Sequence, residues 1–384
     1  MLNYIRQQIK DFNEASFLHA LKIFMCVAGG AILYCAIFSG FQIVDEFEHL
    51  HASWLISEGK LPYRDFFEHH HPLLWYVFAP VVGIFYDNVI IFYIVRGISV
   101  IVSVITLIYV YKISLFFTSK TGGIIAIVLS LSSIITLYNF HQFRPDNFMN
   151  LFFIMGIYYW LLYLKDKQNK SLTISFVCFA VSVMFLQKIS ILLMLIEIIL
   201  LVLIIKKRMQ FKTTIISAIP AIILLILFIG YFVYNDIFYE YISLNLRFNQ
   251  ALVYYFDRGS FWHKNLFYSL YGVGFVACLY LYKKQNLYFR ILAIIYIFEF
   301  LMRALYFSPH PNYYTLLTFL NALVLSPIAI NICNKYKHFA IIFIVSVFIY
   351  MGNLLNTVIR TSEKYNSLGG AKRIKLALKI QKCR

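Results

Sequence analysis

Charged residues are scarce in this sequence. Only 13% of its 384 residues are Asp, Glu, Lys or Arg, and 61% are hydrophobic, whereas a soluble domain is about a quarter charged and about half apolar. No stretch between the apolar runs is able to build a soluble core of its own. The scarcity therefore excludes a soluble globular protein.

The cysteines also show no recognisable spacing pattern. The six cysteines are scattered, mostly within apolar segments, and form no CxxC pair, which excludes a zinc ribbon and a disulfide scaffold. A cleavable signal sequence is not expected either. The first apolar run, residues 20–41, is long for a signal and is followed by no small-residue cleavage site.

Apolar runs of about 20 residues recur along the whole chain, and each can cross a hydrocarbon layer of ~30 Å. A backbone in lipid must satisfy its hydrogen bonds internally, so the sequence predicts an all-α polytopic membrane protein. About eleven spans are expected, at residues 20–41, 89–111, 121–140, 148–164, 172–187, 189–205, 214–234, 265–282, 288–307, 312–332 and 338–357.

The formal charge of +17 could suggest nucleic acid, but the basic residues lie mostly in alternate short loops, where they orient helices. This alternation predicts a cytoplasmic N-terminus and an outer C-terminus. It holds only if residues 72–86, too short to cross, form a helix in the outer interface. Residues 46–58 form a second such helix. We expect one membrane-embedded domain, residues 1–360, and a short basic tail, 361–384, without a soluble C-terminal domain.

Polar groups gather in the outer loops. Asp45 and Glu46 follow the first span, where a carboxylate is costly unless it is solvated or paired. Asp45 could be a general base for an acceptor hydroxyl, or an acid that merely ends the helix. Arg144 and Asp146 lie between two spans. We expect Asp146 to face Asp45, with Arg144 orienting it, although Pro145 also suits a simple turn that starts a helix.

Isolated cations near outer helix ends form a third group. Such residues usually snorkel to lipid headgroups, but they could also stabilise a leaving phosphate. Glu299, one turn before Arg303, neutralises that arginine. The candidate phosphate-binding residues are Lys188, Arg247, Arg258 and Arg303.

Two histidine-rich stretches resemble a metal-ligand patch. Residues 48–51 read EHLH and residues 68–71 read EHHH, and His with carboxylate binds Zn²⁺ or Mn²⁺. The spacing matches no known compact site. We therefore expect no metal site and no required cofactor, although a divalent cation stays an open alternative.

Three motifs resemble the GT-C glycosyltransferases, specifically protein O-mannosyltransferases and lipid A aminoarabinose transferases. Asp45-Glu46 is followed by GKLPYRDF at 59–66 and HPL at 71–73; Arg144-Pro145-Asp146 starts the fourth span; Lys188 follows the fifth. Leu73, Ile189 and Ser190 depart from the family's usual residues. The segment HPNYY at 310–314 is a weaker match.

The resemblance implies an inverting hexosyl- or pentosyltransferase that uses a polyprenyl-phosphate sugar outside the membrane. Its acceptor would be a lipid, a glycan or a protein, and nucleic acid is not expected as a partner. The absence of organelle signals favours a bacterial inner membrane. Asp146 and Glu46 would orient hydroxyls. The sugar or acceptor would contact Arg144, Arg64, Asp65, His71, His310, Tyr313 and Tyr314.

Two other functions stay open on sequence. A polysaccharide polymerase or ligase also acts on polyprenyl-linked glycans and uses a pair of outer-loop arginines, which Arg247 and Arg258 could supply. A flippase or transporter shares the helix count, but it would place ionisable groups near the bilayer midplane and show paired half-repeats. No such repeat is evident in this sequence.

Overall fold

The computed structural model describes residues 14–38, 44–251, 261–305, 311–336 and 339–349, together with 352 and 356. Within these residues the chain is helical and forms no β-strand, apart from an isolated bridge between Pro62 and Phe66. The predicted basic tail and the end of the last expected span lie outside the described residues.

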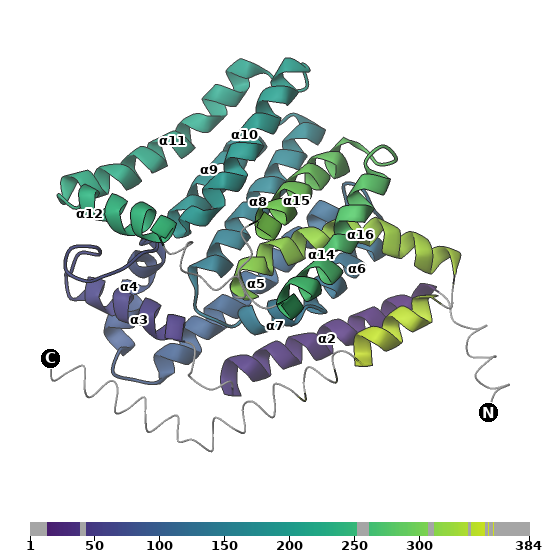
Figure 1. Ribbon diagram of the computed structural model, residues 1–384, viewed down its shortest axis with the longest axis horizontal. Coiled ribbons are helices and arrows are strands. Elements are labelled where there is room, and N and C mark those ends of the chain that lie inside the picture. The colour runs from purple at the N-terminus through teal and green to yellow at the C-terminus, as the bar shows by residue number, and fades with distance from the viewer. Residues whose placement is uncertain are drawn as a thin grey trace.

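The helices follow one another through short connections (Figure 1). In chain order they are α2 (Glu14–Phe38), α3 (Val44–Ser57), α4 (Leu73–Phe85), α5 (Ile90–Ser114), α6 (Lys120–Leu131), α7 (Ile134–Asn139), α8 (Pro145–Asp166), α9 (Asn169–Phe185), η1 (Gln187–Ile189), α10 (Ser190–Ile205), α11 (Phe211–Tyr234), α12 (Phe238–Ile242), η2 (Ser243–Phe248), α14 (Phe261–Leu281), α15 (Leu287–Leu305), η3 (Pro311–Tyr314) and α16 (Thr315–Lys335).

Six of the described helices are long and apolar enough to cross a membrane: Ala15–Phe38, Ile90–Ser114, Pro145–Asp166, Gln187–Ile205, Phe211–Tyr234 and Thr315–Lys335. Shorter apolar helices lie at Leu73–Phe85, Lys120–Leu131, Asn169–Phe185, Phe267–Leu281 and Phe339–Ile349. The all-α polytopic membrane fold is therefore confirmed. The two expected non-crossing helices of the first loop correspond to α3 and α4, which pack against each other.

The expected span at residues 121–140 is interrupted. α6 ends at Leu131 and α7 begins at Ile134. Ser132 Oγ donates a hydrogen bond to the Val128 carbonyl, 2.7 Å away, and Ser133 adopts an extended backbone. Serine side chains compete in this way for helical carbonyls and favour a break, which an apolar-run count does not detect.

α9 packs between α8 and α11 (Figure 1). The approach of α9 to α8 depends on Gly156, because a Cβ atom there would lie 2.4 Å from the Phe179 ring. Small residues allow such close helix contacts in membranes. Ser175 Oγ donates to the Gly156 carbonyl at 2.8 Å, and Ser182 Oγ donates to the Met149 carbonyl at 2.9 Å. By contrast, most large side chains of α11 are exposed, as expected of a lipid-facing helix.

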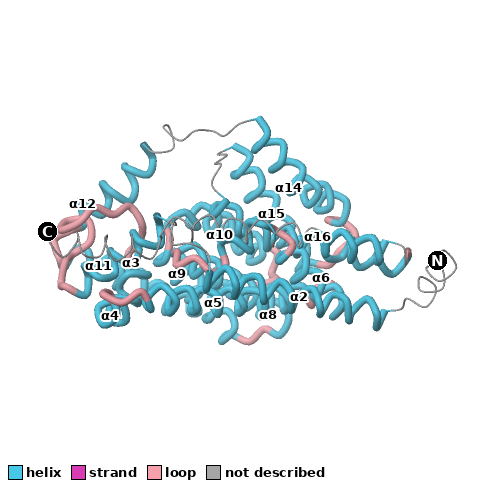
Figure 2. The backbone as a smooth tube through the Cα atoms, turned by 90° about the horizontal axis from the view of Figure 1, so that it is seen from below, coloured by secondary structure: helices cyan, strands magenta, loops and turns pink. Residues whose placement is uncertain are grey.

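The basic loops gather at one end of the helices. Lys167, which follows α8, donates from Nζ to the Arg208 carbonyl after α10, and Asn286, before α15, donates to the Phe116 carbonyl after α5. α8 begins at the opposite end, at Pro145. Figure 2 shows α3, α4 and α12 together at one side of the molecule. The fold thus separates the basic connections from the segment that contains Asp146.

Candidate active site

Four charged residues converge at the start of α8, and we call them the paired-charge cluster: Asp45, Arg144, Asp146 and Lys188. Arg144 forms ion pairs with Asp45 and, through Nε at 3.3 Å, with Asp146. Lys188 Nζ forms an ion pair with the other oxygen of Asp146. Residues far apart in sequence therefore meet around one buried carboxylate, and Arg144 joins the two aspartates.

Local sequence explains this convergence. Arg144 is extended, with φ −142° and ψ 146°, and Pro145 takes the first turn of α8, where its missing N–H costs nothing. Asp146 therefore lies at the helix N-terminus, where negative charge is stabilised. Leu186 is extended and ends α9, so the short η1 turn can direct Lys188 back toward α8.

The two aspartates differ in accessibility. The Asp146 side chain is 7% exposed and the Asp45 side chain is 41% exposed. Asp146 is engaged by two cations, whereas Asp45 contacts Arg144 and remains accessible. Asp45 is thus the more accessible carboxylate of this cluster.

Tyr313, in η3, adds an aromatic wall beside the cluster. Lys188 Nζ lies 4.6 Å from its ring centroid, and the Arg303 guanidinium carbon lies 5.9 Å from it. Arg303 is paired with Glu299 at 2.7 Å, as expected from their spacing. Burial, assisted by the Asp146 charge, raises the pKa of the Tyr313 phenol, so this hydroxyl stays protonated. Two cations that were expected to bind phosphate therefore share one aromatic neighbour.

The expected role of Glu46, to orient a substrate hydroxyl, requires a correction. Its carboxylate is 1% exposed and forms an ion pair with the fully buried Arg96 of α5, with Nη2 at 2.6 Å. Glu46 also accepts a hydrogen bond from the Phe143 amide at 3.1 Å. A carboxylate buried in this way does not contact a substrate; it fixes the loop before Arg144. Arg96 was not recognised from sequence, although an arginine inside an apolar span is itself a signal of a buried partner.

Arg64 and Asp65 also lie away from the cluster, in the loop after α3. Arg64 pairs with Asp65 at 3.5 Å and donates to the Asn235 carbonyl at 3.3 Å. Asp65 accepts a hydrogen bond from the Leu61 amide at 2.7 Å. These contacts close the loop on itself and on the end of α11, and the contact of Arg64 and Asp65 with sugar stays a prediction.

His71 and Tyr314 are likewise used in packing. His71 Nδ1 donates to the Val183 carbonyl at 2.6 Å, and its Nε2 accepts from the Tyr241 hydroxyl at 3.0 Å. The imidazole therefore joins α9 to α12. Tyr314 is buried against α14, with its ring centroid 5.4 Å from that of Phe267. Of the two neighbouring tyrosines, only Tyr313 is directed toward the paired-charge cluster.

Of the remaining expected residues, the structure describes Arg247, which has no contact with the paired-charge cluster. Arg247 is exposed on η2, with its guanidinium 5.8 Å from the Tyr239 ring centroid. Arg258 and His310 lie outside the described residues.

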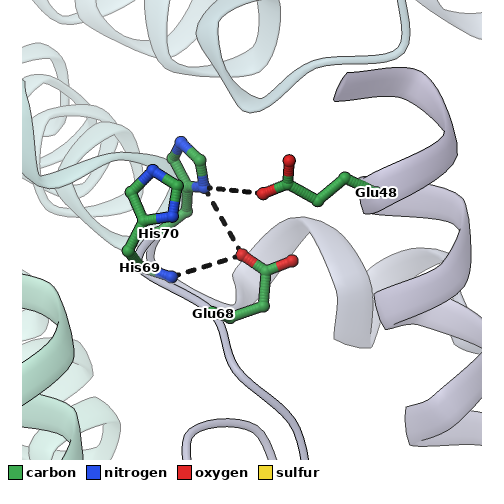
Figure 3. Close-up of side chains that lie close together, drawn as sticks. All are labelled: Glu48, Glu68, His69 and His70. Atoms are coloured by element: carbon green, nitrogen blue, oxygen red, sulfur yellow. Dashed lines mark hydrogen bonds and ion pairs between the residues drawn. The ribbon is translucent and has the colours of Figure 1, made fainter. Parts of the chain in front are cut away.

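A second group of side chains lies nearby, and we call it the glutamate–histidine cluster: Glu48, Glu68, His69 and His70 (Figure 3). Glu48 comes from α3, and the others come from the loop that precedes α4. His70 Nδ1 lies 3.5 Å from Glu68 and 3.7 Å from Glu48. Burial raises the pKa of Glu68 to about 8, and burial with the Glu68 charge raises that of Glu48 to about 7. The sequence pointed to these residues but did not show that they meet.

Comparison with known protein families gives a match over part of the chain. The model of the dolichyl-phosphate-mannose-protein mannosyltransferase family matches residues 69–234. This range contains Arg144, Asp146 and Lys188. Over this range the chain is similar to that family, and the match supports a membrane glycosyltransferase of the GT-C type. The resemblance drawn from the sequence motifs is thereby confirmed, and no curated protein matches the chain.

Proposed function

We propose that this GT-C glycosyltransferase moves a sugar from a polyprenyl-phosphate donor to an acceptor hydroxyl, with inversion at the anomeric carbon. The observation that carries the proposal is the paired-charge cluster. It joins one accessible carboxylate, Asp45, to Lys188 through Arg144 and Asp146. A base for the acceptor and a cation for the leaving phosphate thus belong to one connected network.

In the proposed reaction Asp45 removes the proton of the acceptor hydroxyl while that oxygen attacks C1 of the sugar. The new bond joins the acceptor oxygen to C1, and the bond from C1 to the phosphate oxygen breaks. Attack from the face opposite the phosphate gives inversion. General-base assistance of this kind contributes about 10²–10⁴-fold to a rate.

The charge of the site is balanced through this step. Asp45 changes from anion to neutral acid as it takes the proton, and the donor phosphate gains one negative charge as its bond to the sugar breaks. Lys188 and Arg303 both lie close to the Tyr313 ring, so both are suited to stabilise that growing charge. Asp146 keeps Lys188 and Arg144 in position rather than contacting the reacting atoms.

The proposed side of the membrane follows from the basic loops. They gather at the end of the helices opposite Asp146, and Lys and Arg are concentrated in cytoplasmic loops. The cluster would then face the outside of a bacterial plasma membrane. A polyprenyl-phosphate sugar with its chain among the helices would present its phosphate there, to a lipid, glycan or protein acceptor.

A ligase that depends on two outer-loop arginines gains no comparable support. Arg247 is exposed and contacts Tyr239 rather than the paired-charge cluster. The polymerase or ligase alternative therefore lacks a site among the described residues.

The direct test is a transfer assay. The full-length protein, reconstituted in lipid nanodiscs, is incubated with a labelled polyprenyl-phosphate hexose or pentose and with membrane extract as the acceptor source. We expect label in an acceptor fraction, and NMR of the product should show the anomeric configuration opposite to that of the donor. Retention of configuration would contradict the mechanism, and hydrolysis without any acceptor product would contradict the transferase assignment.

A further inference from the structure

Among the described residues, the carboxylates of the glutamate–histidine cluster are not paired with lysine or arginine, as several other carboxylates are. Asp45 and Asp146 are paired with Arg144, Glu46 with Arg96, and Glu299 with Arg303. Within the described ranges, neither Glu48 nor Glu68 forms an ion pair with a lysine or an arginine. The two carboxylates, one of them 3% exposed in its side chain, instead share a hydrogen bond with each other and face imidazoles.

The four side chains offer metal-ligand atoms at a suitable separation. One ligand atom from each residue can be chosen so that all lie within 4.8 Å of one another. In a tetrahedral zinc site with bonds of ~2.1 Å, neighbouring ligand atoms are ~3.4 Å apart. The contacts of His70 Nδ1 with Glu68 and Glu48, at 3.5 and 3.7 Å, already approach this value. The remaining ligand atoms would reach this separation if each side chain shifted by less than about 1 Å.

The loop conformation makes two adjacent histidines usable by one ion. In an extended strand, neighbouring side chains point to opposite faces. Here the rings of His69 and His70 lie on the same side, with centroids 4.0 Å apart and an interplanar angle of 42°. Figure 3 shows a ring nitrogen of His70 facing both Glu48 and Glu68, with the His69 ring beside it.

Contacts behind these side chains hold the loop in place. The His69 carbonyl accepts hydrogen bonds from Gln187 Nε2 at 2.9 Å and from Asn249 Nδ2 at 2.7 Å, and the His69 amide donates to Glu68 at 3.3 Å. Such outer contacts orient metal ligands. Gln187 is the neighbour of Lys188 in η1, so the loop is tied directly to the turn that positions the phosphate-binding lysine.

We propose that Glu48, Glu68, His69 and His70 bind one Zn²⁺ ion that clamps α3 to the loop before α4. Two imidazoles with two carboxylates suit zinc better than Mg²⁺ or Ca²⁺, which prefer oxygen ligands alone. Four protein ligands fill a tetrahedral shell and leave no open position, so the ion is structural and takes no part in the transfer. This site is separate from the paired-charge cluster, and its test requires no sugar donor.

The test uses the full-length chain without a polyhistidine tag, reconstituted in nanodiscs, stripped with a chelator and titrated with Zn²⁺ against a colorimetric competitor. We expect one tight Zn²⁺ per chain. Glu68→Gln should weaken binding by at least about 100-fold, because loss of even an outer-contact residue costs 10–100-fold. Co²⁺ in the stripped protein should give the intense visible absorption of a tetrahedral site, and this absorption should be absent in Glu68→Gln.

His51→Gln is the matched control. His51 lies on the same helix as Glu48 but contacts Tyr86 at 3.2 Å, so this variant should keep wild-type zinc affinity. Because Glu68 is buried, Glu48→Gln serves as a second variant at the more exposed ligand, and both are checked for monodispersity. Zn²⁺ should raise the thermal midpoint of the wild type and of His51→Gln, since a ligand that binds the folded state stabilises it. Equal zinc affinity in wild type and in a monodisperse Glu48→Gln or Glu68→Gln, or no tight zinc in wild type, would overturn the proposal.

Discussion

The paired-charge cluster and the glutamate–histidine cluster lie side by side and each has two carboxylates, yet they are neutralised differently. In the first, Arg144 and Lys188 compensate Asp45 and Asp146 with permanent positive charge. In the second, burial lowers the pKa of His69 to about 4 and lowers that of His70 as well, so neutral imidazoles face the two glutamates. The comparison teaches that a carboxylate's role is decided by what neutralises it.

The largest expected effect is at the accessible carboxylate of the paired-charge cluster. Asp45→Asn removes the base but keeps the size of the side chain, so we expect transfer to fall by about 10²–10⁴-fold, with expression and donor binding retained. Turnover and donor affinity, measured on the same nanodisc preparation, separate the two quantities. Turnover at the wild-type rate would refute the base assignment and remove the functional contrast between the clusters.

The next effect concerns Glu46, which follows Asp45 in the sequence. Its charge is neutralised in the interior by Arg96. Arg96→Met leaves Glu46 buried without its cation and should lower the free energy of unfolding by about 3–5 kcal/mol, measured by denaturant titration in detergent micelles. The double variant Glu46→Leu with Arg96→Met should recover much of this loss, because no lone charge remains. If Arg96→Met changed turnover without changing stability, Glu46 would belong to the active site after all.

Lys188→Gln probes the cation that the paired-charge cluster shares with the proposed phosphate site. We expect kcat to fall by about 10²–10³-fold, the usual loss when one stabiliser of developing charge is removed. Lys188→Arg keeps the charge and should restore part of the rate. A change confined to KM would indicate that Lys188 binds the donor equally well before and during reaction, rather than stabilising the leaving phosphate.

The smallest effect is expected at Arg303. Its charge is already offset by Glu299 at 2.7 Å, so Arg303→Gln should reduce turnover less than Lys188→Gln does. Arg247→Gln is the control, because Arg247 is exposed and lies over Tyr239, and it should leave turnover unchanged. A larger loss for Arg247→Gln than for Arg303→Gln would favour a mechanism based on the outer-loop arginines.

Much of the fold followed from the sequence, because apolar runs long enough to cross a membrane can form only helices there. The break between α6 and α7 was missed because it depends on Ser132 and Ser133 rather than on hydrophobicity. The meeting of Asp45 with Asp146 through Arg144 was also expected, since all three follow or precede spans on the same side.

Long-range partners were harder to predict. The Arg96 partner of Glu46 lies two helices further along the chain, and no periodic pattern links the two residues. The glutamate–histidine cluster needs a helix and a distant loop to meet, so linear spacing could not show that Glu48 approaches Glu68. The directions of His71 and Tyr314 depend on the packing of α9, α12 and α14 rather than on their place in a motif.

The glycine contact between α8 and α9 has a consequence for the outer surface. Asp146 begins α8 and Lys188 follows α9, so the separation of these two side chains depends on how closely the helices pack at Gly156 and Phe179. An added methyl group at position 156 would act as a spacer about three turns away from the ion pair. The geometry of the ion pair between Asp146 and Lys188 therefore depends partly on the absence of a side chain at Gly156, between α8 and α9.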